Sequence, residues 1–219
     1  MTTYKVGYIV GSLSKDSINR ILSKAMVKLA PPELEMVEIP IGQLPLYNRD
    51  LDNDFPPAAR DLKAGIAAAD AILFVTPEYN RSIPSALKNA IDWASRPFGK
   101  NAFHRKPTGM VGASTGKIGT AIGQSHLRSI MAFCNAPLMN SIEVYIQFTP
   151  GLITDDGSVT VEFGSRNLCS GPLPGVSHHI QCTVWTCARG EGYRGYERGG
   201  GFSIDGKVGP VASRFPAPG

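Results

Sequence analysis

The stretch that most constrains the fold is a fully apolar run followed by a short polar loop and a helical pattern. Residues 71–75 (AILFV) have the length of a strand, and a run without polar positions is typical of a strand covered on both faces. The loop 76–84 follows, and Pro84 suits the first turn of a helix because its missing N–H costs nothing there. Beyond it, apolar side chains recur with helical spacing, which predicts a helix over residues 85–95.

The loop 76–84 (TPEYNRSIP) is the first candidate site. In open α/β sheets, ligands bind at the edge where parallel strands end. Exposed loop N–H groups and the positive end of a helix dipole favour an electron-rich ligand at such an edge. Ser82 is placed to help cap the following helix.

The rest of the first 150 residues repeats this pattern. Strands are expected near residues 4–10, 34–39, 107–113 and 144–148, the last preceded by a short extended piece at 137–140; helices are expected over 18–29, 59–69 and about 121–134. Four β–α units predict a doubly wound parallel sheet of five strands in the order 2-1-3-4-5.

Two further loops follow predicted strands. Residues 11–20 (GSLSKDSINR) place Ser12, Ser17 and Asn19 at a helix N-terminus, with Ser17 as the expected N-cap. Hydroxyls and backbone N–H groups in this position suit a phosphate dianion, although an ordinary β–α turn with a serine cap explains them too. In the loop 114–121 (STGKIGTA), glycines let the backbone approach a flat ring closely.

Together, these loops resemble the NADPH-dependent FMN reductase family, which includes chromate and quinone reductases and azoreductases of flavodoxin-like fold. The resemblance covers about residues 4–162, and its most specific segments are TPEYN at 76–80, Ser82, Pro84, LKNAIDW at 87–93 and SRP at 95–97. It implies FMN as cofactor, NADPH or NADH as co-substrate, and quinones, flavins, azo compounds or chromate as electron acceptors. It also implies a homodimer or homotetramer.

The resemblance assigns residues to the FMN site. The family has an arginine where this chain has Ser14, a loss for which Lys15 or Arg20 would compensate. No catalytic side chain and no metal are expected, because the flavin carries the hydride chemistry. Arg81 is a candidate for binding an anionic substrate or the NADPH phosphate, with a solvated loop arginine as an equal alternative. The expected cofactor-binding residues are Ser12, Ser14, Lys15, Ser17, Asn19, Pro77, Glu78, Tyr79, Asn80, Ser82, Ser114 and Gly116.

Other polar residues and Trp93 are expected to have structural roles, not roles in the reaction. Glu78 and Asp92 are not expected to form an acid–base pair, and Lys88 and Asp92 are expected to be solvated or interface residues of the helix. His126 is expected on a helix surface, and Trp93 in the core or an interface.

Net charge and apolar runs indicate the expected partners and cellular compartment. The formal net charge is +4, and most of the excess lies after residue 162, so the body offers no nucleic-acid surface. No apolar run has the length of a bilayer span, and the N-terminus enters a strand without a signal-peptide pattern. A cytoplasmic protein with a small-molecule acceptor, and without nucleic-acid or membrane partners, is therefore expected.

The last 57 residues depart from the pattern. Residues 163–219 contain half of the chain's 24 glycines, and a chain so rich in glycine cannot offset its ordering entropy by burial. We expect a flavodoxin-like domain over 1–162 and an irregular tail over 163–219. A zinc site at His178, His179, Cys182 and Cys187 and an RNA-binding tract at 189–202 are weak alternatives there. Without the family's terminal helix, the chain could instead be inactive. A flavin-binding electron carrier without NAD(P)H turnover is a further alternative.

Overall fold

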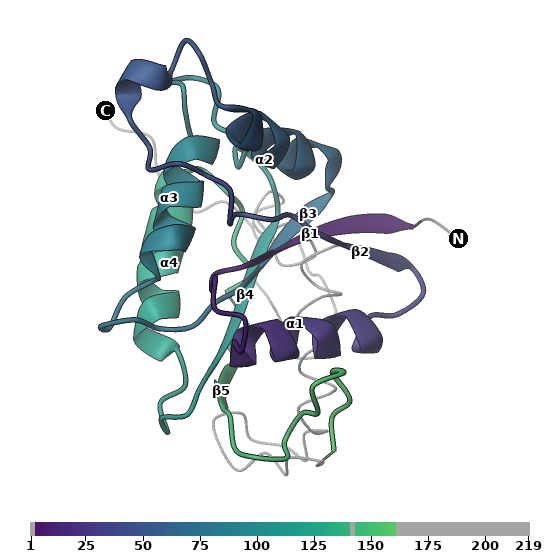
Figure 1. The fold of residues 1–219 in the computed structure, drawn as a ribbon. Coiled ribbons are helices and arrows are strands. Elements are labelled where there is room, and N and C mark those ends of the chain that lie inside the picture. The colour runs from purple at the N-terminus through teal and green to yellow at the C-terminus, as the bar shows by residue number, and fades with distance from the viewer. Residues whose placement is uncertain (1–2, 141–142, 161–219) are drawn as a thin grey trace, which may run out of the picture.

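The computed structural model describes residues 3–140 and 143–160. A central parallel sheet has the strand order β2-β1-β3-β4-β5 (Figure 1), which confirms the predicted order. The elements in chain order are β1 (Tyr4–Val10), α1 (Ile18–Leu29), β2 (Leu34–Glu38), a 3-10 turn (Arg49–Leu51), α2 (Pro57–Ala68), β3 (Ala71–Val75), α3 (Ser85–Ala94), β4 (Thr108–Ser114), α4 (Ala121–Phe133) and β5 (Tyr145–Gln147).

The apolar run 71–75, from which the fold was predicted, forms β3 in the middle of the sheet. All five residues of β3 are completely buried, and β3 pairs with β1 on one side and with β4 on the other. The fifth strand is only three residues long, and the extended piece before it contributes a single bridge between Leu138 and Thr108. The split fifth strand is therefore confirmed.

The helices cover both faces of the sheet. Figure 1 shows α1 on one face and α2, α3 and α4 on the other. Two apolar cores result, one centred on Leu22 and Met26 of α1 and one centred on Leu87, Ile91 and Trp93 of α3. Trp93 is completely buried and thus belongs to the core.

Side chains of α3 hold the loop between β2 and α2 in place. Asn89 accepts a hydrogen bond from the N–H of Tyr47 at 2.8 Å, and its amide donates to the Pro45 carbonyl at 2.9 Å. Arg96, two residues beyond α3, forms an ion pair with Asp52 at 2.8 Å and also donates to the Tyr47 hydroxyl. Burial raises the pKa of the Tyr47 phenol, which stays neutral and donates to Asp52. The loop therefore forms a fixed wall beside α3.

The segment after β5 folds back against α1. Lys28 of α1 donates to the Asp156 carboxylate at 2.6 Å, and Thr154 and Ser158 donate to the same carboxylate. These hydrogen bonds, with that of Lys28 the largest cause, hold the pKa of Asp156 well below its ordinary value.

Asp156→Asn is expected to weaken the acid dependence of stability. Because the folded-state pKa of Asp156 is depressed, its contribution is present above the unfolded pKa of about 3.9 and is lost as pH falls. The difference in unfolding midpoint between wild type and D156N should therefore shrink from about pH 6 to about pH 3 in urea melts. Glu35→Gln, at an exposed glutamate 3.8 Å from Lys5, is the control. A constant difference would contradict the assignment.

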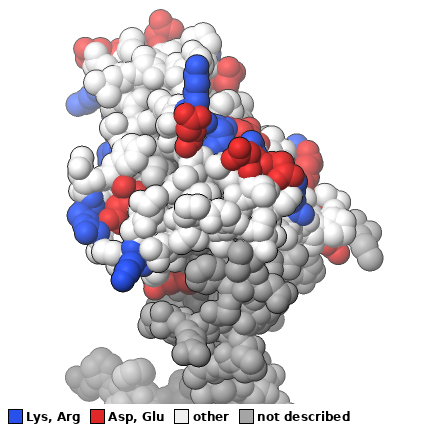
Figure 2. All heavy atoms as spheres, turned by 60° about the horizontal axis from the view of Figure 1, so that its bottom comes forward, with Lys and Arg blue, Asp and Glu red and all other residues white. Residues whose placement is uncertain are grey.

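The predicted tail of residues 163–219, with its histidines and cysteines, lies outside the described residues. Among the helices of residues 3–140 and 143–160, none combines the length and the apolar character of a bilayer span. On the face drawn in Figure 2, basic and acidic side chains are interspersed.

Candidate functional site

The three predicted loops meet at the carboxyl edge of the sheet, following β1, β3 and β4. Gly11 and Gly112 let these strand ends approach each other. A Cβ on Gly112 would lie 2.1 Å from the carbonyl oxygen of Thr76, and one on Gly11 would lie 2.5 Å from the Thr76 hydroxyl. Any side chain at either position would push the loops apart.

The loop after β1 presents unused hydrogen-bond donors. Ser12 and Ser17 are buried, and the Ser17 side chain makes no cap hydrogen bond to α1, although Ser17 is the N-cap residue as predicted. Among the hydrogen bonds within the described residues, none has its donor at the backbone N–H of residues 15–19. A set of free N–H groups and buried hydroxyls at the start of a 12-residue helix fits a phosphate group.

The Asn19 side chain links two elements of the fold. The residue is completely buried; its amide donates to the Ala113 carbonyl at 2.9 Å and its Oδ1 accepts from the Ala113 N–H at 2.9 Å. Both polar atoms are therefore used to join the first turn of α1 to β4. The backbone N–H of Asn19 remains available to a phosphate, so its place in the cofactor site stays a prediction that rests on the backbone.

The charge that could replace the missing family arginine comes from one residue. Arg20 forms an ion pair with Glu38 at 3.0 Å, so it is directed to β2 and not to the loop. Ser14 and Lys15 are exposed, and Lys15 has no ion-pair partner in the described part of the chain. Lys15 is thus the remaining candidate of the two that the sequence suggested.

The loop after β3 contains a tight hairpin that the sequence analysis did not predict. Tyr79 and Ser82 exchange two backbone hydrogen bonds of 2.9 Å, and Asn80 and Arg81 between them have φ values of 51° and 63°. Positive φ at both central residues is the mark of a type I′ turn, which favours asparagine and glycine. An arginine in this conformation is strained by about 1 kcal/mol. The asparagine at 80 was the available signal for the turn.

Glu78 joins this hairpin to α4. One carboxylate oxygen accepts hydrogen bonds from the N–H groups of Ile122 and Gly123, at 3.0 and 2.9 Å, and the other accepts from Arg81 at 3.1 Å. The Glu78 side chain is only 8% exposed. A carboxylate in this position satisfies the first N–H groups of α4 and complements its dipole. Both oxygens of the Glu78 carboxylate are thus used within the protein, and the assignment of Glu78 to the cofactor site stays a prediction.

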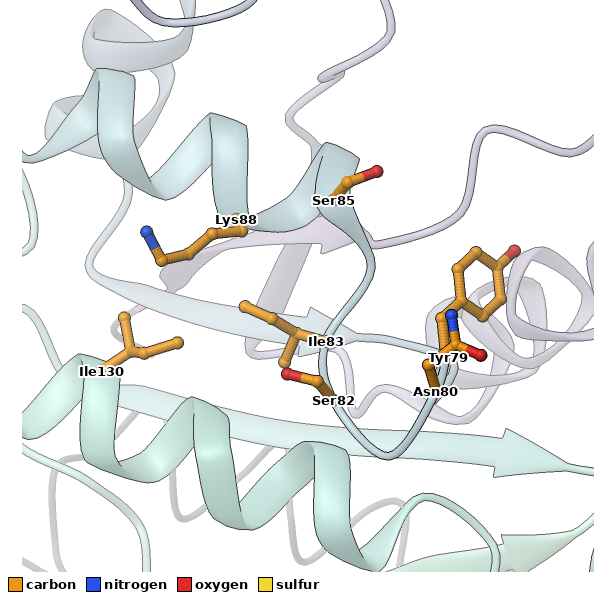
Figure 3. A pocket seen from close by; sticks show the side chains of 7 residues that line it. All are labelled: Tyr79, Asn80, Ser82, Ile83, Ser85, Lys88 and Ile130. Carbon is orange, nitrogen blue, oxygen red and sulfur yellow. The ribbon is translucent and has the colours of Figure 1, made fainter.

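The hairpin lines a pocket of about 430 Å³ between α3 and α4 (Figure 3). Tyr79 and Asn80 lie at one end, Lys88 and Ile130 at the other, and Ser82 between them. Lys88 is paired with Asp92 at 2.6 Å on the surface of α3. This agrees with the expectation that both are solvated or interface residues of the helix.

Ser82 does not cap α3 as predicted. The N-cap position is Pro84, and the Ser82 hydroxyl instead lies 3.0 Å from Nδ1 of His126 on α4. His126 is on the helix surface as expected, but no local sequence signal indicated this contact.

A second depression of about 270 Å³ lies on the other side of the α3 N-terminus. Leu13 contributes from the loop after β1, and Leu44 and Leu46 contribute from the loop before α2. Ser85 lines both depressions, so the first residue of α3 separates them. The structure therefore places the hairpin residues and the loop after β1 on two sides of one helix start.

The loop after β4 completes the edge. The Ser114 hydroxyl accepts a hydrogen bond from the Gly116 N–H at 3.2 Å, and both residues are at least partly exposed. Gly119 has a φ of 57° and packs against backbone atoms of Tyr145 and Ile146, so a side chain there would be strained and crowded. Pro77 is half-buried before the hairpin.

The sheet order and the three loops at its carboxyl edge define a flavodoxin-like α/β protein with a nucleotide-binding edge. The chain belongs to the NADPH-dependent FMN reductase family, whose sequence profile matches residues 4–151. FMN is accordingly the cofactor and NAD(P)H the co-substrate. When bound, FMN supplies the hydride-accepting ring that links the two half-reactions.

Named relatives agree with this family. A 2-hydroxy-1,4-benzoquinone reductase of Burkholderia sp. is 49% identical over 158 residues, which are 72% of this chain and 86% of the relative. A quinone reductase of Pseudomonas putida is 44% identical over 158 residues, 71% of this chain and 84% of the relative. The flavoenzyme NAD(P)H:(acceptor) oxidoreductase FerB of Paracoccus denitrificans superposes with a TM-score of 0.76 at 40% identity, covering 85% of this chain and 96% of FerB.

Proposed function

We propose that this protein reduces quinones with electrons from NAD(P)H, passed through FMN held at the carboxyl edge of the sheet. The proposal rests on the hydrogen-bond donors at the start of α1 that have no partner within the described residues, which are the backbone N–H groups of residues 15–19 and the Ser17 hydroxyl. They lie at the same carboxyl edge of the sheet as the hairpin after β3. Quinones come first among acceptors because relatives at 49% and 44% identity are named for quinone reduction. Free flavin, azo compounds and chromate are further candidate acceptors.

The proposed residue roles follow the three loops. Ser12, Ser17 and the N–H groups of residues 15–19 would hold the phosphate, with Lys15 adding charge. Ser14 contributes only its small exposed hydroxyl. Pro77, Tyr79, Asn80 and Ser82 would line one side of the ring, and Ser114 with Gly116 its other edge. Glu78 would act by holding the hairpin against α4.

The first test is the visible spectrum of the full-length protein before and after anaerobic NADPH. A yellow protein that bleaches with NADPH and regains colour with 1,4-benzoquinone supports the proposal. A yellow protein that does not bleach indicates an electron carrier. A colourless protein that stays colourless with added FMN overturns the flavin assignment.

Ser14→Arg is expected to tighten FMN binding about three- to tenfold, because it adds one charge-assisted hydrogen bond to a phosphate. The measurement is a fluorescence-quenching titration with FMN. Riboflavin, which lacks the phosphate, is the matched ligand control and should bind wild type and S14R equally. An equal gain for both ligands would place the phosphate elsewhere.

Arg81→Gly is expected to leave stability unchanged or slightly higher, because glycine adopts the positive φ without strain. NADPH differs from NADH by one additional phosphate, on its adenosine ribose. If Arg81 attracts that phosphate, R81G should raise the KM for NADPH about threefold or more and change the KM for NADH less. Equal changes for NADPH and NADH would favour a solvated arginine whose role is the Glu78 ion pair.

We further propose a homodimer or homotetramer. Leu46, Phe98 and Phe133 are 83%, 91% and 94% exposed, and large apolar side chains in such positions are common at subunit interfaces. Light scattering coupled to size exclusion would give the mass, and a monomer at micromolar concentration would contradict the proposal.

A further inference from the structure

His126 is the ionisable residue whose contact with the hairpin has no role in the proposed mechanism. It lies on the exposed side of α4, with Nδ1 3.0 Å from the hydroxyl of Ser82. Within the described residues, His126 is the only recorded side-chain partner of that hydroxyl. Ser82 lines the pocket between α3 and α4, so a change at His126 is transmitted to the pocket wall.

We infer that His126 is a positioning residue whose protonation turns the Ser82 hydroxyl from a hydrogen-bond acceptor into a donor toward the pocket. With neutral imidazole protonated at Nε2, the Ser82 O–H donates to Nδ1, and only oxygen lone pairs face the pocket. In the imidazolium state, Nδ1–H must donate to Ser82 Oγ, which frees the Ser82 proton for another acceptor. The inference rests on the proposed function for the identity of that acceptor, a quinone carbonyl.

A donor at this position assists the reaction because the quinone oxygen becomes negative as a hydride reaches the quinone. A hydrogen bond to the developing charge lowers the barrier. The hydroquinone monoanion that forms then takes a proton from solvent, so the quinone has gained one hydride and one proton in total. Ser82 keeps its proton throughout and only orients it.

The neighbouring charged groups form ion pairs with one another. Around α4, the hairpin contributes Glu78 with Arg81, and α3 contributes Lys88 with Asp92. Arg128 of α4 pairs with Glu143 in the segment before β5. These three ion pairs have N–O distances between 2.6 and 3.2 Å. No ion pair of His126 occurs in the part of the chain that the structure describes.

The first test needs no cofactor. In the flavin-free protein, imidazole ¹⁵N shifts followed from about pH 5 to about pH 8 report the tautomer and the protonation of each histidine. In wild type, neutral His126 should carry its proton on Nε2, and Ser82→Ala should shift that tautomer balance and the titration midpoint. His104, whose Nδ1 lies 3.1 Å from the Asn135 amide, is the internal control and should not respond. Identical His126 shifts in wild type and S82A would overturn the inference.

The second test is the pH profile of quinone reduction. The ratio of kcat/KM for 1,4-benzoquinone between wild type and His126→Gln should fall about three- to tenfold from about pH 5.5 to about pH 8. His104→Gln should follow wild type, and the double variant S82A/H126Q should match S82A alone. Parallel profiles for wild type and H126Q, in protein that NADPH still bleaches, would overturn the inference and leave the proposed function standing. Failure of NADPH to bleach the flavin would overturn the proposed function instead, and the imidazole shifts would still decide whether His126 and Ser82 are linked.

Discussion

Replacing Asn19 by alanine is expected to lower the free energy of unfolding by about 2–5 kcal/mol, because it leaves the buried N–H and carbonyl of Ala113 without partners. The loss should appear in urea melts and as a fall in Tm of about 5–15 °C. FMN binding should weaken as well, since Asn19 fixes the start of α1 relative to β4.

Two variants make this prediction specific. Asn53→Ala, in an exposed loop, is the matched control and should change stability by less than about 0.5 kcal/mol. Asn19→Asp keeps an acceptor for the Ala113 N–H but cannot donate to its carbonyl while it is ionised. Burial raises the pKa of such an acid, so N19D should gain stability between about pH 7 and about pH 5, where protonation restores the donor. A pH-independent N19D deficit would show that the amide contributes packing alone.

The second large effect is expected at Glu78. Glu78→Ala removes the acceptor for the first N–H groups of α4 and the partner of Arg81, at a cost of about 2 kcal/mol. The hairpin after β3 then loses its link to α4, and a site that is no longer preorganised binds its ligand less well. We expect FMN affinity to fall about tenfold, or about 1.4 kcal/mol, in titrations at a temperature where the variant is folded.

Glu78→Gln separates hydrogen bonding from charge. The amide oxygen still accepts from the α4 N–H groups, so only the ion pair and the interaction with the helix dipole are lost, about 0.3–1 kcal/mol. Glu35→Ala, at an exposed glutamate of β2, should change neither stability nor FMN affinity measurably. Unchanged FMN affinity in E78A would show that the hairpin keeps its position without this carboxylate.

Much of the fold followed from local pattern. The apolar run 71–75 is β3 with all five residues buried, and the stripe over 18–29 is α1 with the same bounds. These elements were predictable because burial on one or both faces imposes a period on the sequence that neighbouring residues share. The hairpin after β3 was missed because an arginine occupies a positive-φ position that usually takes asparagine or glycine.

The amino-acid sequence was sufficient to predict the elements, the three loops and the family, since these depend on residues close together in the chain. The strand order was also predictable, because alternating strands and helices have few ways to form a doubly wound sheet. The partners of the polar side chains at the site depend instead on the packed fold. Asn19 bonds a residue 94 positions away, and Glu78 and Ser82 each contact α4 about 44 positions away. Such side chains choose among several acceptors and donors of similar strength, so their partners are fixed by which backbone groups the packed sheet and helices leave unsatisfied nearby. For this reason, the hydrogen bonds by which Asn19 and Glu78 hold the loops of the candidate site together were not predicted.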